Sequence, residues 1–314
     1  MKVIDLGLDL PPSTEEIAAK LKLFLGDIKG RGIANYRRIF GPRWAAALGM
    51  TLEDIDTRRQ ELSEAEFNAL LDSAAQMLTI SPEAFVRQVE QAGIEWGLVD
   101  SPDLDKTAAF VQRFPERFKG MALLNPFEGM QAVRQLESAV LELGFVAFYA
   151  SPFDWKIPAN DRLFFPLYAK AAELNIPVFI YTAMNYNTEL PMDLARPLNL
   201  DAVAMAFPEL KIVADCGGWP WVPELVGLAR RHPNVYINTS SHRPKHLATP
   251  GSGWEMLMQF GNTLLQDQVV FASGASDLGM PLAQVVQEML ALPLKDAVKE
   301  KWMYKNALRL FDLD

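Results

Sequence analysis

Two aspartates and one tyrosine lie at positions of the sequence where their side chains could take part in proton transfer. Asp9 and Asp215 each follow a short apolar run of the sequence, and Tyr181 closes another. Burial at such a position raises the pKa of a carboxylate, so that it can act as a general acid or base near neutral pH. We expect Asp215 to transfer the proton and Tyr181 to donate a hydrogen bond to a substrate oxygen. The alternative for both aspartates is a hydrogen bond to loop backbone.

The chain contains only three histidines, which are His232, His242 and His246. His232 precedes Pro233-Asn234 at the start of an apolar run, so we expect it to be structural. His242 and Arg243 follow the apolar run that ends at Thr239. Because functional groups concentrate on loops of this kind, His242 is a second catalytic candidate and Arg243 is expected to contact the substrate. A solvated or capping histidine is the alternative.

Several other polar side chains are candidates for binding a substrate. Hydroxyl, amide and carboxyl groups can fix a small molecule by hydrogen bonds, although tyrosines at strand ends are often packing groups. The substrate-binding residues that we predict are Asp9, Tyr149, Asn185, Arg243 and Ser273. A hard cation held by the oxygens of Asp5, Asp9, Asp215 and Asp277 is an alternative that the sequence leaves open.

Short apolar runs alternate with amphipathic stretches along most of the chain, the pattern of parallel strands covered by crossover helices. The eight runs are Lys2–Leu8, Ile94–Val99, Phe118–Leu124, Phe145–Ala150, Pro177–Tyr181, Lys211–Ala214, Val235–Thr239 and Gln268–Ser273. Eight such pairs predict an α/β fold, a (β/α)8 TIM barrel. No linker-like tract divides the sequence, so we expect residues 1–314 to form a single domain, with the site at the carboxyl ends of the strands.

Start signals for helices lie between the runs, and one long segment interrupts the alternation. The starts are Ser81-Pro82-Glu83, Asn160-Asp161 and Pro223-Glu224. Residues 11–80 follow the first run and hold about three helical patterns, including Ser13–Leu25 and Leu62–Leu78. We expect a helical insertion there. It would form either a wall or lid of the site, or the subunit interface of a homodimer.

The composition excludes some classes of partner. The 314 residues are 50% hydrophobic and 22% charged, with a net charge of -9. Because no run of Lys and Arg interleaves with aromatics, nucleic acid is not expected as a partner. No segment approaches the roughly 20 apolar residues that a membrane span needs. With one cysteine, Cys216, the chain has no internal disulfide, and we expect a cytoplasmic protein.

Short motifs in matching order give the chain its resemblance to a family. They are Val3-Ile4-Asp5, Leu143 to Val146, Asp161 with Pro166-Leu167-Tyr168, Asn175 to Val178, Phe207 to Val213, Gly217 to Pro220, His232 to Tyr236 and Asn306 to Phe311. The chain resembles the amidohydrolase-related family of the second type, which includes metal-dependent hydrolases and related aromatic decarboxylases. The resemblance implies a TIM barrel whose site would normally hold a divalent metal on imidazoles and a carboxylate.

The residues of this chain at the positions of those ligands are different. The positions after the first strand hold Gly7 and Asp9, those of the fifth and sixth strands hold Tyr181 and Asp215, and that of the eighth holds Gly274, unless Asp277 takes its place. We expect these residues to surround one cavity without a metal or other cofactor.

Two functions remain open at this point. The first is a metal-independent hydrolase, decarboxylase or other lyase that acts on a small carboxylated or aromatic molecule. The second is a non-catalytic binding or accessory protein. The replacements favour the enzyme, because structural drift would more often have filled the mouth of the barrel with apolar side chains.

Overall fold

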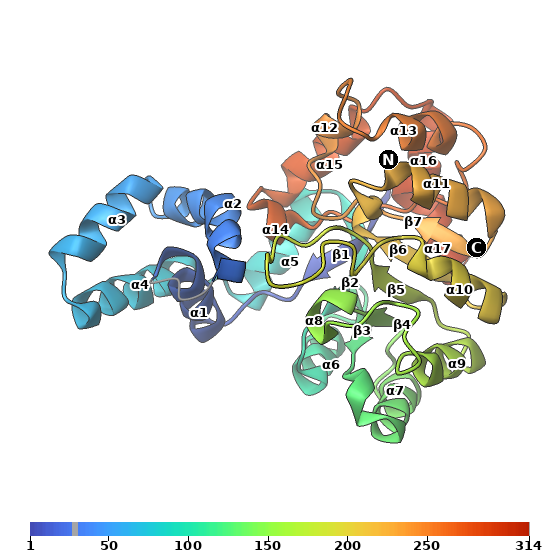
Figure 1. The fold of residues 1–314 in the computed structure, drawn as a ribbon, viewed down its shortest axis with the longest axis horizontal. Coiled ribbons are helices and arrows are strands. Elements are labelled where there is room, and N and C mark those ends of the chain that lie inside the picture. The colour runs from blue at the N-terminus through green and yellow to red at the C-terminus, as the bar shows by residue number, and fades with distance from the viewer. Residues whose placement is uncertain (27–30, 314) are drawn as a thin grey trace. The chain divides into compact units, whose positions relative to one another are not determined.

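The computed structural model describes residues 1–26 and 31–313, which divide into two compact units. The barrel unit comprises Met1–Leu10, Arg87–Met184 and Asp193–Asp314, and the helical unit comprises Pro11–Val86 and Asn185–Met192 (Figure 1). The single domain that we expected for residues 1–314 stays a prediction.

Seven parallel strands form the sheet of the barrel unit, and they neighbour one another in the order of the sequence. In Figure 1 they lie at the centre of this unit with helices around them. The strands are β1 (Val3–Asp9), β2 (Ile94–Asp100), β3 (Phe118–Leu123), β4 (Ala147–Ala150), β5 (Val178–Tyr181), β6 (Ile212–Asp215) and β7 (Val235–Ile237). Seven of the eight predicted runs are therefore strands.

The eighth run, Gln268–Ser273, is not a regular strand but closes the ring by backbone hydrogen bonds. On one side, the Val270 nitrogen donates to the Ile237 oxygen at 2.9 Å. On the other side, the Leu6 nitrogen donates to the Phe271 oxygen at 3.0 Å. Because the run pairs with both β7 and β1, the predicted TIM-barrel fold is confirmed.

Helices follow most strands of the barrel unit. They are α5 (Pro82–Gln91, which crosses the boundary between the units), α6 (Leu104–Arg113), α7 (Met130–Leu141), α8 (Pro152–Trp155), α9 (Phe165–Glu173), α10 (Asn199–Ala206), α11 (Val222–Arg231), α12 (Pro244–Leu247), α13 (Glu255–Gly261), α14 (Ala275–Leu278), α15 (Leu282–Leu290), α16 (Asp296–Glu300) and α17 (Asn306–Leu310). Short 3-10 turns lie at η1 (Pro126–Glu128) and η2 (Cys216–Gly218), and η3 (Lys301–Lys305) is a π-helical turn. No helix in the described ranges is long and apolar enough to span a membrane.

The predicted helix starts at Pro82 and Pro223 are confirmed to within one residue, whereas the start at Asn160-Asp161 is wrong. The Asp161 carboxylate accepts a hydrogen bond from the Leu163 nitrogen at 2.9 Å. This bond between an aspartate and the backbone two residues on stabilises a turn, so α9 begins only at Phe165.

The interior of the barrel is filled by side chains that alternate along the strands. The buried residues of this core include Ile4, Leu6, Trp96, Leu98, Met121, Ala147, Phe179, Val213, Tyr236, Val270 and Ala272. Side chains two residues apart on a strand share a face. The next inward positions toward the carboxyl ends are therefore Asp100, Tyr149, Tyr181, Asp215 and Asn238, and this layer forms the candidate site.

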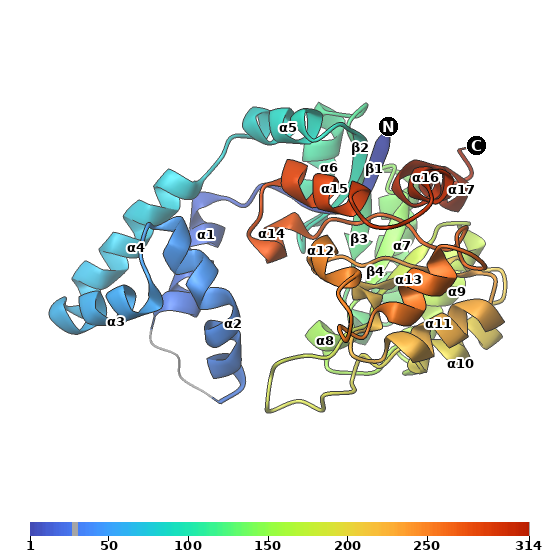
Figure 2. The ribbon, with the colours of Figure 1, turned by 90° about the horizontal axis from the view of Figure 1, so that it is seen from above.

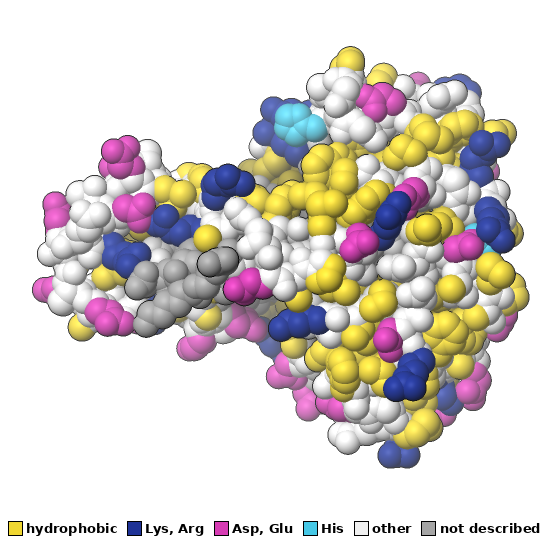
Figure 3. Space-filling model, in the orientation of Figure 1, with side chains coloured by type: hydrophobic (Ala, Val, Ile, Leu, Met, Phe, Trp, Pro, Cys, Tyr) yellow, Lys and Arg dark blue, Asp and Glu magenta, His cyan; other side chains and the backbone are white. Residues whose placement is uncertain are grey.

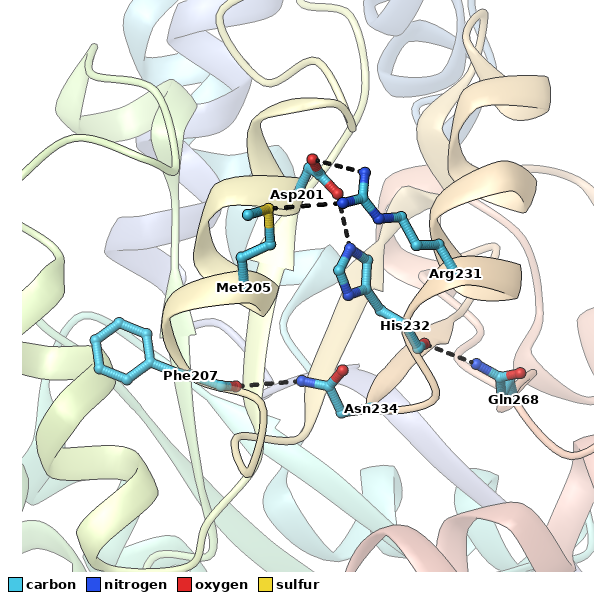
Figure 4. A network of polar contacts seen from close by, with 7 residues as sticks. All are labelled: Asp201, Met205, Phe207, Arg231, His232, Asn234 and Gln268. Atoms are coloured by element: carbon cyan, nitrogen blue, oxygen red, sulfur yellow. Dashed lines mark hydrogen bonds and ion pairs between the residues drawn. The ribbon is translucent and has the colours of Figure 1, made fainter.

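The opposite end of the barrel carries a network of polar contacts (Figure 4). The His232 ring nitrogen Nε2 lies 2.7 Å from Asp201 Oδ1, and Gln268 donates to the His232 carbonyl at 3.2 Å. Asn234 donates to the carbonyl oxygens of Phe207 at 3.3 Å and Leu210 at 2.8 Å. These contacts connect α10 and α11 with the sheet. They agree with the structural role expected for His232.

The helical unit has a core of its own. It contains α1 (Thr14–Leu25), α2 (Arg31–Ala47), α3 (Leu52–Glu61) and α4 (Glu64–Leu78), whereas the sequence indicated about three helices (Figure 2). Ser13 and Ser63 cap α1 and α4 in capping boxes with Glu16 and Glu66. Buried residues such as Leu21 and Leu71 belong to one cluster within this unit. The roles of lid or subunit interface stay predictions.

The surface shown in Figure 3 carries both signs of charge, interspersed with apolar side chains. This face therefore carries no continuous basic stripe of the kind that binds a nucleic-acid backbone.

Candidate functional site

Asp215 lies at the carboxyl end of β6, and its carboxylate accepts hydrogen bonds from two side chains. Tyr149 donates its hydroxyl to Asp215 Oδ2 at 3.1 Å, and the Cys216 thiol donates to the same oxygen at 3.4 Å. Asp215 is 8% exposed. Burial raises the pKa of Asp215, while the side chains of Asn238, Cys216 and Tyr149 act in the opposite direction. The raised pKa suits a group that must both accept and release a proton.

Tyr149 approaches Asp215 from β4. Burial, followed by the negative charge of Asp215, raises the pKa of Tyr149 well above its usual value. The hydroxyl therefore keeps its proton and serves as a hydrogen-bond donor.

Cys216 follows Asp215 in an unusual backbone conformation. Its φ is 64°, a left-handed value that residues other than glycine seldom adopt. Gly217 continues the turn with φ 63°, and a Cβ there would lie 2.6 Å from the Trp254 ring. Burial raises the pKa of Cys216 well above its usual value, so the group remains a thiol. Cys216 directly follows the predicted acid–base residue in the sequence, but it was not among the predicted site residues.

Asp100 ends β2 and is a further member of the layer. It is the residue paired with Asp9 of β1 in the sheet. Burial is the largest of the causes that raise the pKa of Asp100 well above its usual range. The charges of nearby carboxylates raise this pKa further, and they belong to Asp9, Asp215, Asp277 and Asp154. Asp100 was not among the predicted site residues, because the predicted run stopped at Val99. The alternation of Trp96, Leu98 and Asp100 was the signal that could have found it.

Two of these carboxylates, those of Asp9 and Asp277, are exposed and have hydroxyl partners. Ser276 donates to Asp9, and Ser241 donates to Asp277 Oδ2 at 2.6 Å. Asp9 thus stands at the end of its strand, as expected, with its carboxylate bonded to α14.

Asp5 lies one layer deeper in the barrel, and it connects β1 to the closing segment, Gln268–Ser273, by a hydrogen bond. Its Oδ1 accepts hydrogen bonds from the nitrogens of Ser273 at 2.8 Å and Gly7 at 3.0 Å. Burial raises the pKa of Asp5 to about 6, and its buried Oδ2 has no hydrogen-bond partner among the residues that the structure describes. The Ser273 hydroxyl donates to the Gly7 oxygen at 3.3 Å, so Ser273 also takes part in closing the barrel. Its predicted contact with substrate remains a prediction.

Tyr181 and Asp215 are paired residues of β5 and β6. The Tyr181 hydroxyl donates to the Met184 oxygen at 3.3 Å, and its ring centroid lies 6.2 Å from that of Phe153. The side chain is half-buried. Tyr181 is therefore in the predicted layer, and its hydroxyl has a backbone partner within the strand's own loop.

His242 lies against two tryptophans. Its ring centroid is 4.9 Å from that of Trp254, edge to face, and 6.5 Å from that of Trp219. Burial lowers the pKa of His242 to about 4, whereas a hydrogen bond with the Cys216 backbone acts in the opposite direction. The imidazole is neutral at neutral pH. The structure thus connects His242 to Asp215 through the backbone of Cys216.

Arg243 makes an ion pair with Glu288 of α15. Its Nε lies 3.0 Å from both carboxylate oxygens of Glu288, and a terminal nitrogen bonds Oε1 at 2.5 Å. The guanidinium lowers the pKa of Glu288 to about 2. This pairing fixes the loop after β7 on α15. Contact of Arg243 with a substrate remains a prediction.

Asn185 belongs to the helical unit. Its Nδ2 donates to the Pro191 oxygen at 2.8 Å, and its Oδ1 accepts from the Asn187 nitrogen at 3.0 Å. These bonds shape the loop 185–192. The predicted role of Asn185 in substrate binding is untested.

The side chains at this site do not fit the divalent metal that the family resemblance implies. Within residues 1–26 and 31–313, no group of three or more His, Cys, Asp and Glu side chains is arranged to hold a metal ion. Positions that would supply ligands carry Gly7, Tyr181 and Gly274. Gly7 and Gly274 instead join β1 to the closing segment, since the Gly274 nitrogen donates to the Gly7 oxygen at 3.1 Å.

Fold and site together define an amidohydrolase-type barrel with a carboxylate-rich mouth. The model of the amidohydrolase family matches residues 35–313, and the chain belongs to this family. The resemblance seen in the sequence is thereby confirmed, and the relatives named below include enzymes.

Three known proteins are similar to the chain. A 2-keto-4-carboxy-3-hexenedioate hydratase of Sphingobium is 25% identical over 185 residues, which are 52% of this chain; the match spans 53%, about half, of that relative's length. An uncharacterised TIM-barrel protein of Bordetella bronchiseptica has a TM-score of 0.69 and 23% identity, covering 100% of this chain and 99% of its own. A 5-carboxyvanillate decarboxylase of Novosphingobium aromaticivorans, complexed with manganese and a nitrobenzoic acid, has a TM-score of 0.62 and 16% identity, covering 99% and 96%.

Proposed function

We propose that the protein is a metal-independent enzyme of the amidohydrolase fold, with Asp215 as its general acid–base. Its substrate would be a small carboxylated or aromatic molecule, and the reaction a hydrolysis, a decarboxylation or another lyase step. The observation that carries the proposal is the contact of Tyr149 with the buried Asp215 carboxylate at the end of β6. The position is the one where the family resemblance places a catalytic histidine.

The surrounding groups support acid–base chemistry on such a substrate. Asp100 has its pKa raised, which favours its neutral form, and a neutral carboxyl can donate a hydrogen bond to a substrate carboxylate. Tyr149 remains protonated and can hold Asp215 in a fixed orientation. The substrate class is taken from the names of the hydratase and the decarboxylase to which the chain is similar.

The test is turnover of a panel of hydroxylated benzoates, pyrone carboxylates and unsaturated keto diacids by enzyme freed of metal with EDTA. Asp215→Asn keeps the shape of the side chain and removes its proton transfer. With a substrate that is turned over, kcat should fall about 100-fold or more while KM changes little.

A different outcome would point to another assignment. Full turnover by Asp215→Asn would place the acid–base elsewhere, with His242 as the next candidate. Binding of panel compounds without any turnover by the unaltered protein would favour a non-catalytic binding protein of this fold.

A further inference from the structure

The Asn238 side chain is fixed by two backbone donors. Asn238 follows β7 and is completely buried. Its Oδ1 accepts hydrogen bonds from the nitrogens of Cys216 and Ser240, both at 3.1 Å. Since an amide oxygen with two donors fixes the orientation of its group, Nδ2 must point away from both nitrogens. Nδ2 is buried and makes no hydrogen bond of ordinary geometry with a described residue.

Asp215 lies beside Asn238, whose backbone nitrogen donates to the oxygen of the preceding residue, Ala214, at 3.1 Å. The Asn238 side chain lowers the pKa of Asp215, and this effect is the largest of those that oppose burial. A buried donor without a partner is destabilising unless it acts on a nearby acceptor. The carboxylate is the acceptor whose proton affinity this amide affects. Asn238 therefore acts on Asp215 from β7, while Tyr149 does so from β4.

Cys216 connects the two residues. Its nitrogen donates to Asn238 and its thiol donates to Asp215, at 3.1 and 3.4 Å. Cys216 makes both bonds from a left-handed conformation, which costs backbone energy. Such strained residues persist where the surrounding structure requires them, and they cluster at functional sites. The backbone of the same residue acts on His242, where a hydrogen bond with it opposes the lowering of the pKa by burial.

We propose that Asn238 and Cys216 are positioning residues, which hold the Asp215 carboxylate in place for proton transfer. The inference rests on the proposed function of Asp215. Neutral donors are suited to this task, because they stabilise the ionised carboxylate without adding a charge. The charge of Asp277 of α14 acts on Asp215 in the opposite direction, and the titratable Asp100 of β2 also interacts with Asp215.

The proposal can be tested without a substrate. In protein labelled with ¹³C at the aspartate carboxyl carbons, the Asp215 resonance is identified by its loss in Asp215→Asn. Its titration midpoint is then followed by NMR. In Cys216→Ala, which removes the thiol donor, the midpoint should move to higher pH. Cys216→Ser retains an O–H donor and should return it toward that of the unaltered protein.

Asn238 needs two variants. Asn238→Ala should move the Asp215 midpoint to higher pH, but it also leaves the Cys216 and Ser240 nitrogens without their acceptor. Asn238→Asp keeps that acceptor and removes the donor, but its new carboxylate adds a like charge that by itself moves the midpoint to higher pH, so Asn238→Ala is the deciding variant. The matched control is Asn234→Ala, which removes an asparagine at the other end of β7 and should leave the Asp215 titration unchanged. Unchanged midpoints in Cys216→Ala and Asn238→Ala would overturn the proposal.

Activity supplies an independent readout. If a panel compound is turned over, the limb of the pH profile of kcat/KM that follows Asp215 should move with the NMR midpoint in each variant. A protein that turns over no compound would contradict the proposed function, while the NMR titration would still decide the positioning role. Loss of turnover in Asp215→Asn together with unmoved midpoints would retain the proposed function and refute the positioning role.

Discussion

Asp9 and Asp100 are paired across the ends of β1 and β2, and the charge of Asp9 acts on Asp100. Two carboxylates at neighbouring strand ends disfavour simultaneous ionisation. Burial is the largest cause of the raised pKa of Asp100 and the charge of Asp9 adds to it, so the neutral form of Asp100 is favoured. The proposed function uses this carboxyl as a hydrogen-bond donor beside the ionisable carboxylate of Asp215.

Tyr181→Phe tests the role of the second tyrosine of the layer. If its hydroxyl orients a substrate oxygen, kcat/KM should fall about 10-fold, the effect of one hydrogen bond. The fall should be smaller than that caused by Asp215→Asn. The measurement is steady-state kinetics on a turned-over panel compound. A kcat/KM equal to that of the unaltered enzyme would restrict the hydroxyl to its bond with Met184.

Asp5→Asn should remove a pH dependence of stability. The pKa of Asp5 is raised to about 6 in the folded state, so the folded protein holds its proton between about pH 4 and 6 while the unfolded chain releases it. This contribution to stability is fully present below the unfolded pKa and is lost as pH rises through 6. It amounts to about 3 kcal/mol.

Urea unfolding at pH 4.5 and pH 7.5 measures this effect. Asparagine keeps an oxygen that can accept from Gly7 and Ser273 but cannot ionise. Asp5→Asn should therefore gain stability relative to the unaltered protein on going from the lower to the higher pH. An equal stability difference at both pH values would contradict the raised pKa.

The purified protein should contain no stoichiometric zinc, iron or manganese. The reason is the donor set, because glycines and a tyrosine occupy positions that would carry nitrogen and oxygen ligands. Emission spectroscopy of the purified chain measures the metal content, and EDTA should leave any activity unchanged. Close to one transition metal per chain, removable with loss of activity, would refute this prediction.

Arg243→Lys separates an ion-pair role from contact with the substrate. Lysine keeps the charge but cannot make the two-pronged bond to Glu288, so the free energy of unfolding should fall by about 1 kcal/mol. Chemical denaturation measures the loss. An additional rise in KM on a turned-over compound would show that Arg243 also contacts the substrate, and unchanged stability would contradict the importance of the ion pair.

The sequence by itself determined the barrel and most of its strands. The alternation of buried runs with amphipathic stretches has a direct physical cause, since parallel strands covered by helices must be apolar on both faces. Capping signals at Ser13 and Ser63 likewise act within one turn and could be identified locally. The position of Asp215 after its run also followed from the sequence.

Only the tertiary structure decided how the site is built. The bonds of Asp215 with Tyr149, and of Cys216 with Asn238, join residues that are 66 and 22 positions apart in the chain. The left-handed turn at Cys216 and the pairing of Asp9 with Asp100 depend on which strands become neighbours. A local pattern can place a polar residue at a strand end, but its partners, and therefore its pKa, are set by the groups that folding brings around it.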